Sequence, residues 1–376
     1  MTIPLSLYVH IPWCVRKCPY CDFNSHTADT TLPETRYVDA LLSDLDCELA
    51  LTSPRPLQSI FLGGGTPSLF SGHAIARILD GIRARTALAS DCEITLEANP
   101  GTADAACFAD YRAAGVNRLS IGVQSFHATH LKTLGRIHNG DEAARAIRLA
   151  QQAGFTRINV DLMHGLPTQT ATDAVNDLRT AVDSGVTHIS WYQLTIEPNT
   201  VFYSKPPTLP TEPTLLAIDE AGAALLRAAG FSNYEVSAWS QPNERSRHNI
   251  NYWSFGDYIG IGAGAHGKLT QHDGRIVRRW KTRLPNDYLD SQKSFVAGEQ
   301  AISETDRAVE FFMNALRLRE GVPAALFVER TGLSLASMTP VLTDLRSRGL
   351  LQPDVAQLAT TEHGFRYLDS VLQAFM

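Results

Sequence analysis

The sequence predicts an α/β protein that is built on a parallel β-sheet and ends in a helical domain. Three observations lead to this fold class: short β-rich segments recur through the N-terminal half, helical patterns separate them, and the composition becomes helical from about Ser303. A regular alternation of strand and helix implies right-handed βαβ units. Six such units would form either an open, partial version of the eight-stranded α/β barrel or a doubly wound sheet. Both arrangements place functional groups on loops at the carboxyl ends of the strands.

The elements are expected in a simple order along the chain. The six strands begin at Leu5, Ser59, Glu93, Arg118, Arg157 and His188. The clearest helix starts at Pro33, which suits a first helical turn, and its apolar stripe is formed by Val38, Leu41, Leu42, Leu45 and Leu49. The segment KPPTLPTEPT, residues 205–214, ends the repeating core because proline continues neither a helix nor a central strand. A helix at residues 215–229 and the Gly-rich YIGIGAGAHG then extend the sheet. We therefore expect a barrel at residues 1–205, an extension at residues 206–300 and a C-terminal domain at residues 301–376.

The C-terminal segment has the order helix, helix, wing and helix, which resembles a winged-helix unit. Many winged helices bind DNA, and that role needs a net basic face. Residues 301–376 contain seven Arg and no Lys against nine Asp plus Glu. The sequence therefore favours a structural or protein-docking role and predicts no nucleic-acid partner.

Composition narrows the class of protein further. The chain has 376 residues, 44% of them hydrophobic, which is enough for a large core and excludes a disordered chain. Its formal net charge of −6 gives no overall attraction to nucleic acid or to an anionic membrane. No apolar run approaches the ~18 residues of a membrane helix, and no basic region precedes the first apolar stretch. We expect a cytoplasmic protein without a transmembrane segment, which is compatible with peripheral membrane contact.

Three of the six cysteines lie within one short segment, Cys14-Val-Arg-Lys-Cys18-Pro-Tyr-Cys21, directly after the first expected strand. A structural zinc ion would need a fourth ligand, from His10, His26 or a distant residue. A disulfide is disfavoured in a reducing compartment and would leave one thiol unpaired. Three thiolates also suit a [4Fe–4S] cluster whose fourth iron stays open to another ligand. Cys47, Cys92 and Cys107 have no informative spacing, and we interpret them as structural thiols.

The spacing C-x3-C-x2-C, with an aromatic residue before the third cysteine, resembles the signature of the radical S-adenosylmethionine (SAM) superfamily. The resemblance implies a partial (βα)6 TIM-like barrel with a C-terminal winged-helix-like domain. It also implies a [4Fe–4S] cluster on the three cysteines that chelates SAM and cleaves it to a 5′-deoxyadenosyl radical. The residues it assigns to SAM lie at the ends of successive strands: Tyr8, Gly64, Gly65, Thr66, Glu97, Gln124, Arg136 and Asp161. Of these, Arg136 would pair with the methionine carboxylate. Taken alone, the glycine segment is more often a turn than a site, and the four polar residues that follow it are more often surface or capping residues.

Longer segments resemble one group within this superfamily, the oxygen-independent coproporphyrinogen III oxidases and their relatives. They are YVHIPWCVRKCPYCDFNSH, FLGGGTPS, RLSIGVQSF, INVDLMHGLP and YIGIGAGAHG. The oxidase branch has C-x3-C-x2-C-x-C and a long N-terminal arm. Here the residue after Asp22 is Phe23, and four residues precede Leu5. Both departures favour a second branch, the haem chaperones, whose mark HNxxYW is present from His248 to Trp253.

Within that motif, His248 could ligate haem iron, and Tyr252 and Trp253 could offer flat apolar surface to a porphyrin. The alternative is that His248 caps a loop and the aromatic residues belong to the core. Arg245 and Arg247 could contact haem propionates or be ordinary surface arginines. The resemblance favours a chaperone of porphyrin metabolism that binds haem, SAM and a [4Fe–4S] cluster and passes haem to an acceptor protein. An electron donor would be a further partner if SAM is cleaved, and the oxidase is the alternative function.

Overall fold

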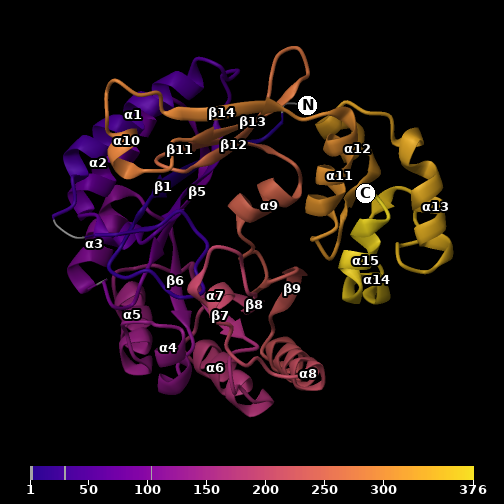
Figure 1. The fold of residues 1–376 in the computed structure, drawn as a ribbon, viewed down its shortest axis with the longest axis horizontal. Coiled ribbons are helices and arrows are strands. Elements are labelled where there is room, and N and C mark those ends of the chain that lie inside the picture. Colours follow the sequence, from indigo (N-terminus) through magenta and orange to yellow (C-terminus); the bar gives the residue numbers. More distant parts are fainter. Residues whose placement is uncertain (1–2, 29–30, 103) are drawn as a thin grey trace.

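The structure, a computed structural model, describes residues 3–28, 31–102 and 104–376. The six expected strands are all present and lie side by side in chain order, each parallel to the next. They are β1 (Leu5–Ile11), β4 (Leu57–Gly64), β5 (Leu88–Ala98), β6 (Arg118–Gln124), β7 (Ile158–His164) and β8 (His188–Gln193). Figure 1 shows that the sheet curves into an arc instead of closing. The partial barrel is therefore confirmed, and the doubly wound alternative is not adopted.

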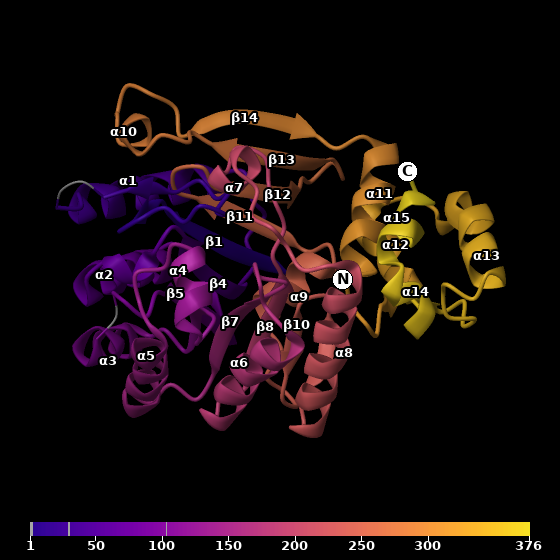
Figure 2. The ribbon, with the colours of Figure 1, turned by 60° about the horizontal axis from the view of Figure 1, so that its bottom comes forward.

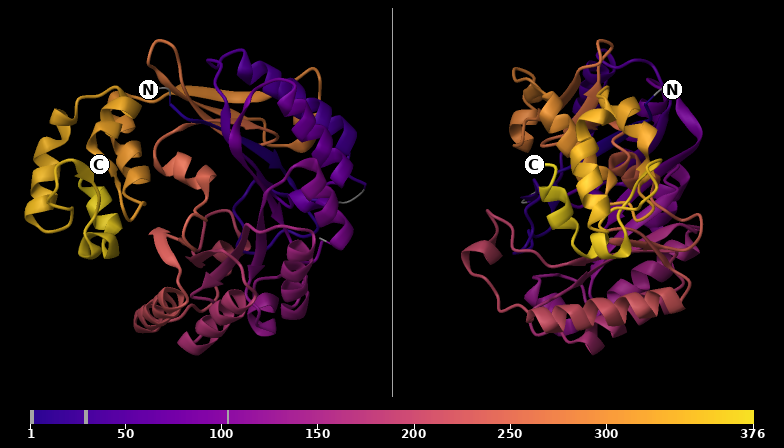
Figure 3. Two further views of the ribbon diagram at one scale, coloured as in Figure 1. Left: turned by 180° about the vertical axis from the view of Figure 1, so that it is seen from behind. Right: turned by 90° about the vertical axis from the view of Figure 1, so that its right-hand side faces the viewer.

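Helices cover the outer side of this arc, as Figure 1 and the view from behind in Figure 3 both show. They are α1 (Glu34–Leu49), α2 (Gly72–Arg83), α3 (Ala105–Ala114), α5 (Gly140–Gln152), α6 (Ala171–Asp183) and α8 (Glu212–Ala228). Capping boxes at Asn139 and Thr170 begin α5 and α6 by satisfying backbone donors of the first turn. Shorter elements lie in the loops: the 3₁₀ helix η1 (Pro67–Leu69), α4 (Ala128–Thr133) and α7 (Val201–Ser204).

The helix α1 buries three residues of its predicted apolar stripe fully and Leu42 and Leu49 partly, and it also buries charge. Val38, Leu41 and Leu45 are fully buried, and so is Asp44, with Glu48 2% exposed. Lys281 donates hydrogen bonds to Asp44 (2.5 Å) and Glu48 (2.6 Å). These partners are 237 and 233 residues away along the chain, so sequence periodicity gave no sign of them.

The sheet extends beyond the six strands at both edges. Beside β1 lies β11 (Asp257–Ile261), which is parallel to it, and then β12 (His266–Thr270), β13 (Ile276–Lys281) and β14 (Val296–Ala301), which are antiparallel. Beside β8 lie the antiparallel β10 (Ala238–Ser240) and β9 (Ser232–Glu235). The short α9 (Arg247–Trp253) lies on the inner side of the arc, and α10 (Pro285–Tyr288) joins β13 to β14. The helix expected at residues 215–229 is α8.

The C-terminal segment forms a separate group of helices beside the barrel (Figure 2). It consists of α11 (Glu304–Ala315), β15 (Val322–Pro323), α12 (Ala324–Thr331), η2 (Leu335–Met338), α13 (Thr339–Ser347), β16 (Gln357–Leu358), α14 (Glu362–Arg366) and α15 (Leu368–Gln373). The ribbon of β15 and β16 occupies the place of a wing. Buried Phe311, Phe312 and Phe327 form the centre of its core, which also includes Phe255 of the extension. Within the described ranges, no helix is long and apolar enough to cross a membrane.

Candidate functional site

The cysteine segment forms a loop at the carboxyl end of β1. Cys14 ends the two-residue strand β2 (Trp13–Cys14), which pairs with β3 (His26–Thr27), and Cys18 and Cys21 lie on the loop between them. The Cys21 amide donates to the Cys18 carbonyl (3.2 Å), which keeps this turn compact. All three thiols are free and partly exposed. The structure thus places three potential ligands on one loop, at the edge of the sheet where function was expected.

The three cysteines open onto a cavity of about 270 Å³. Seven of the eight residues that the resemblance assigns to SAM line the same cavity: Gly64, Gly65, Thr66, Glu97, Gln124, Arg136 and Asp161. The eighth, Tyr8, lies on β1 and lines a neighbouring cavity, and its hydroxyl is 2.9 Å from His10 Nδ1. Residues from five strands and their loops therefore converge on one space.

The donor set of the cavity fits an iron–sulfur cluster. Burial raises the pKa of Cys14, and the thiols of Cys21 and Cys18 raise it further because the three sulfurs are close to one another. A cluster at this site would be held by the deprotonated thiols. Arg136 donates to Cys18 Sγ at 3.7 Å, which places a positive charge beside the cysteine loop.

Two carboxylic acids, Glu97 of β5 and Asp161 of β7, face the cavity. Burial and the nearby charge of Asp161 raise the pKa of Glu97 to about 8, although its Oε2 accepts a hydrogen bond from the Gly64 amide (3.1 Å). Burial also raises the pKa of Asp161, which accepts hydrogen bonds from Ser120 (3.0 Å) and Asn159 (2.8 Å). Two buried acids in one space resist ionising together. A ligand that brings positive charge and hydroxyl groups would stabilise both.

Arg136 supplies the cation of the cavity. Its guanidinium donates to the Gly122 carbonyl (2.6 Å) and to Asn99 Oδ1 (2.9 Å), and its buried Nε has no hydrogen-bond partner in the described part of the chain. Although burial acts to lower its pKa, the neighbouring phenol of Tyr20 and thiol of Cys18 raise it. The group therefore stays charged, held in place beside the cysteines and able to pair with a ligand carboxylate.

The backbone at Gln124, the last residue of β6, has an unusual conformation. Its φ of 69° is in the left-handed region, which is uncommon for a residue with a side chain, and the strand register shifts beside it. Tyr192 of β8 donates to Gln124 Oε1 at 2.7 Å. Sequence reasoning missed Tyr192, which also lines the cavity. The signal available was its inward position on the last expected strand, HISWYQL.

The glycines at the end of β4 bring the backbone close to β1 and β2, and they also line the cavity. At Gly64 φ is +115°, and a Cβ would lie 2.6 Å from the His10 ring. At Gly65 a Cβ would lie 2.5 Å from the Trp13 carbonyl oxygen. The Gly65 and Thr66 amides donate to the carbonyls of Ile11 and Trp13 at 2.8 and 2.7 Å. Contacts within the protein therefore leave no room for a side chain at positions 64 and 65. The Gly65 and Thr66 amides already donate hydrogen bonds to the protein.

Of the residues assigned to haem, His248 lies toward the other end of the barrel, against Ser59 near the start of β4. His248 of α9 is 1% exposed, and burial lowers its pKa to about 3, so its ring is neutral. Its Nδ1 shares a hydrogen bond with Ser59 Oγ (2.9 Å) and its Nε2 with the Tyr252 hydroxyl (3.0 Å). In this arrangement neither ring nitrogen is open to iron. Tyr252 and Trp253 line the cavity that also contains Tyr8.

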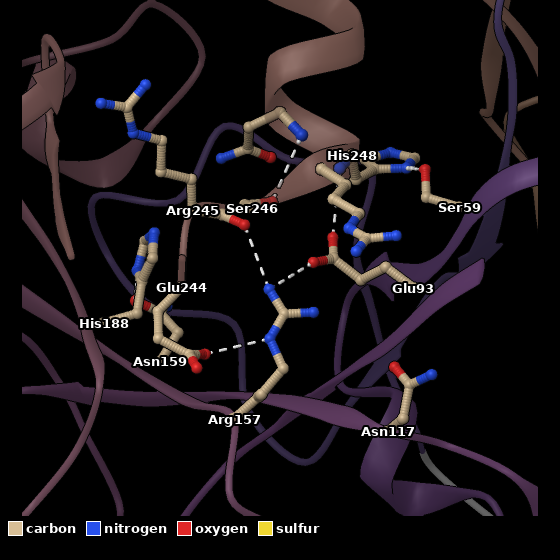
Figure 4. A network of polar contacts seen from close by, with 12 residues as sticks. Ser59, Glu93, Asn117, Arg157, Asn159, His188, Glu244, Arg245, Ser246 and His248 are labelled. Carbon is tan, nitrogen blue, oxygen red and sulfur yellow. Dashed lines mark hydrogen bonds and ion pairs between the residues drawn. The ribbon is translucent and has the colours of Figure 1, made fainter. Parts of the chain in front are cut away.

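A network of polar contacts holds α9 in this position (Figure 4). Glu93 Oε1 accepts the His248 amide (3.1 Å), and Glu93 Oε2 pairs with Arg157 (2.9 Å). Arg157 also pairs with Glu244 (3.0 Å) and donates to the Arg245 carbonyl (3.1 Å). The Arg245 side chain, which sequence analysis offered to haem propionates, pairs instead with Glu320, and that of Arg247 pairs with Asp91.

The other three cysteines lie apart from the cluster loop. Cys47 is exposed on α1, Cys92 is buried on β5, and Cys107 is on α3. None of them lines the cavity of the cysteine loop.

Two family models match this chain. The model described as "Radical SAM superfamily" matches residues 8–181, which contain the cysteine loop and five of the six barrel strands, from β1 to β7, and the model described as "HemN C-terminal domain" matches residues 302–367. A solved structure described as "Coproporphyrinogen III oxidase (HemN) from Escherichia coli is a Radical SAM enzyme" matches with a TM-score of 0.83. It covers 99% of this chain and 90% of that chain at 22% sequence identity, which shows a shared fold.

Curated relatives match over nearly the full length. "Heme chaperone HemW" of Escherichia coli (strain K12) is 52% identical over 373 residues, covering 99% of this chain and 98% of the relative. The protein of the same name in Haemophilus influenzae is 47% identical over 377 residues, with the same coverage. A protein of Bos taurus named "Radical S-adenosyl methionine domain-containing protein 1, mitochondrial" is 34% identical over 385 residues, and the match covers 99% of this chain and 87% of the relative.

Proposed function

Since the chain belongs to the heme chaperone HemW family within the radical SAM superfamily, we propose that it holds one [4Fe–4S] cluster and SAM, binds haem and passes haem to an acceptor protein. The observation that carries the proposal is the convergence of Cys14, Cys18 and Cys21 with seven SAM-assigned residues on one cavity. Relatives named heme chaperone extend the proposal from cofactor binding to haem.

In this proposal, Cys14, Cys18 and Cys21 would hold the cluster, and the cluster would supply the electron for cleavage of SAM. Arg136 binds the methionine carboxylate and keeps its charge beside Cys18. Glu97 and Asp161 receive the positively charged and hydroxyl groups of SAM, and Glu97 releases its proton as the cation binds. Lys17 donates to the Phe23 carbonyl (3.2 Å), which steadies the loop at the cavity mouth.

The alternative function, decarboxylation of coproporphyrinogen, is less well supported. The position of the oxidase's additional cysteine holds Phe23, whose side chain is 59% exposed and lines the cluster cavity. The fold shared with the oxidase structure carries no argument for its activity, because related folds host different functions. The haem contacts of His248, Tyr252 and Trp253, the acceptor protein, the absence of a nucleic-acid partner and a cytoplasmic location remain predictions.

The proposal is tested by absorption spectra of anaerobically reconstituted protein before and after addition of haem. We expect the broad absorption of an iron–sulfur cluster first and a shifted Soret band after haem is added. Haem-loaded protein should then lose haem to apomyoglobin, used as a probe acceptor. Incubation with coproporphyrinogen III, SAM and a reductant should yield no protoporphyrinogen. Turnover in that reaction, or no Soret shift with haem, would overturn the proposal.

A further inference from the structure

A second, larger cavity adjoins the cluster cavity and is not explained by SAM binding. Its volume is about 670 Å³, and it shares Phe23, Gly64 and Glu97 with the cluster cavity. Its walls come from β1, α9, the extension strands β11 to β13 and, through Asn314, the C-terminal helix α11. The space is large enough for a ligand of several fused rings.

The walls of this cavity are aromatic and cationic. Six aromatic side chains with apolar faces line it: Tyr8, Phe23, Tyr252, Trp253, Phe255 and Tyr258. Strand register places Lys268 opposite Tyr258 and Arg278, and residues opposite one another share a face of the sheet. Arg278 pairs with Glu310 (2.7 Å) and Lys268 with Asp257 (3.3 Å).

Arg283 is exposed at the cavity and makes no ion pair within the described residues, so its charge is available to a ligand. Asp257 and Glu310 compensate Lys268 and Arg278, and the lining also contains the carboxyl groups of Asp22 and Glu97, of which Glu97 has a pKa of about 8. The cavity therefore combines flat aromatic walls with one cation, Arg283, that makes no ion pair within the described residues. That combination suits a planar, apolar ligand with negatively charged arms.

Among the histidine and tyrosine side chains of this cavity, hydrogen bonding singles out one iron ligand. His10 uses both ring nitrogens, with the Tyr8 hydroxyl and the Asn24 carbonyl as partners. The Tyr252 hydroxyl bonds to His248, and the Tyr258 hydroxyl accepts from Arg278 (3.1 Å).

His266, at the start of β12, differs from these four groups. It is exposed at the cavity, and its ring makes no hydrogen bond within the ranges that the structure describes. A histidine with free ring nitrogens is a common axial ligand of haem iron.

We propose that haem binds in this second cavity, with His266 as the axial iron ligand and Arg283 as the partner of a propionate. This inference rests on the proposed function, because it takes haem as the cargo. It assigns to His248 a positioning role: its Nε2 fixes the hydroxyl of Tyr252, and Tyr252 and Trp253 form the wall against which the porphyrin lies.

The test compares haem complexes of His266→Ala, Arg283→Ala and His248→Gln with the wild-type complex, by Soret absorption, resonance Raman spectra of the iron–ligand bond and haem titration. The matched control is His272→Ala, because His272 is an exposed histidine on the turn after β12 and lies outside the cavity. We expect His266→Ala to lose the iron–histidine signature and to bind haem at least tenfold more weakly. Added imidazole should restore the signature.

The remaining variants separate the roles of the other residues. Arg283→Ala should weaken haem severalfold without changing the iron ligand, His248→Gln should keep the iron–histidine signature, and His272→Ala should match the wild type. If the wild type binds haem and His266→Ala has the same spectrum, the inference is overturned and the proposed function stands. Loss of the signature in His248→Gln but not in His266→Ala would equally overturn it. If the wild type binds no haem at all, the proposed function fails as well.

Discussion

A glutamate toward the amino end of the barrel and a glutamate at its carboxyl end have pKa shifts of opposite sign. Glu93 and Glu97 lie four residues apart on β5, and both are carboxylic acids removed from water. At the amino end, burial acts to raise the pKa of Glu93, but the guanidinium groups of Arg118 and Arg157 outweigh it and lower the pKa below its usual value. At the carboxyl end, burial and Asp161 raise the pKa of Glu97 to about 8.

The difference is a guide to function. At the amino end, the charge of Glu93 is compensated by the chain itself, which locks α9 onto the barrel. At the carboxyl end, Glu97, three free thiols and the Nε of Arg136 face a cavity with incomplete compensation. Burying polar groups without partners is costly, so such groups mark the place where a ligand completes the structure. Four predictions test this contrast, and they are given from the largest expected effect to the smallest.

The largest effect is expected from Cys18→Ser, because a cluster with two remaining protein thiolates should not assemble stably. Iron and sulfide, measured under anaerobic conditions, should fall to near the background level. Cys47→Ser, at an exposed thiol away from the cavity, serves as the control and should keep a full cluster. Full iron content in Cys18→Ser, or tight zinc in the wild type, would refute the cluster assignment.

The two glutamates of β5 should respond oppositely to replacement by glutamine in the ligand-free protein. Glu93→Gln leaves Arg157 without its buried partner and should lower the free energy of unfolding by about 3 kcal/mol, the low end for a broken buried pair because Arg157 is partly exposed. Glu97 has a folded-state pKa above its ordinary value. Its ionisation therefore destabilises the fold as pH rises toward 8, and Glu97→Gln should be more stable than the wild type at pH 9. Urea unfolding at pH 9 measures both, and equal losses in the two variants would contradict the contrast.

Replacement of Arg136 by alanine should weaken SAM about ten- to a hundredfold, because a charge-assisted hydrogen bond contributes roughly 1.5 to 3 kcal/mol. Calorimetry on reconstituted protein measures this change, and iron content should remain because the guanidinium binds no iron. Arg145→Ala, an exposed arginine of α5, is the matched control. Unchanged SAM affinity in Arg136→Ala would remove this residue from the site.

The smallest effect is expected from pH. If SAM, a cation, binds the ionised form of Glu97, affinity should rise about tenfold between pH 7 and pH 9 and level off above the pKa of about 8. The slope should disappear in Glu97→Gln. Calorimetry in buffers with different ionisation enthalpies would also count the proton released. A wild-type affinity that falls with pH over this range would mean that the protonated acid is the binding form.

The predicted elements agree closely with the structure where they depend on neighbours in sequence. The six strands, the helix from Pro33 and the break after the sixth strand follow from hydrophobic periodicity and from proline, which act over a few residues. The cysteine spacing is equally local, and the expected SAM residues came from the resemblance to the radical SAM superfamily, which assigns them to positions at the ends of successive strands. Seven of the eight line the cavity with the cysteines.

Sequence reasoning was least informative about residues whose partners are distant in the chain. HNxxYW was visible in the sequence, but the burial of His248 against Ser59, 189 residues away, was not. Tyr192 was missed because its role is defined by Gln124, 68 residues earlier. His266 looked like part of a Gly-rich extension until β12 placed it at the same cavity as Tyr252 and Trp253.

The sequence by itself therefore determined the kinds of element, their order and the group of residues that could bind a cluster and SAM. Only the tertiary structure decided which of the buried charges are compensated by the chain and which are left for a ligand. The physical reason is that periodicity and spacing reflect contacts within a turn or a strand, whereas the ionisation of a buried group depends on every charge that packing brings near it. Glu93 and Glu97 are both glutamates of one strand. Packing brings arginines beside Glu93 and lowers its pKa, whereas burial and Asp161 raise the pKa of Glu97.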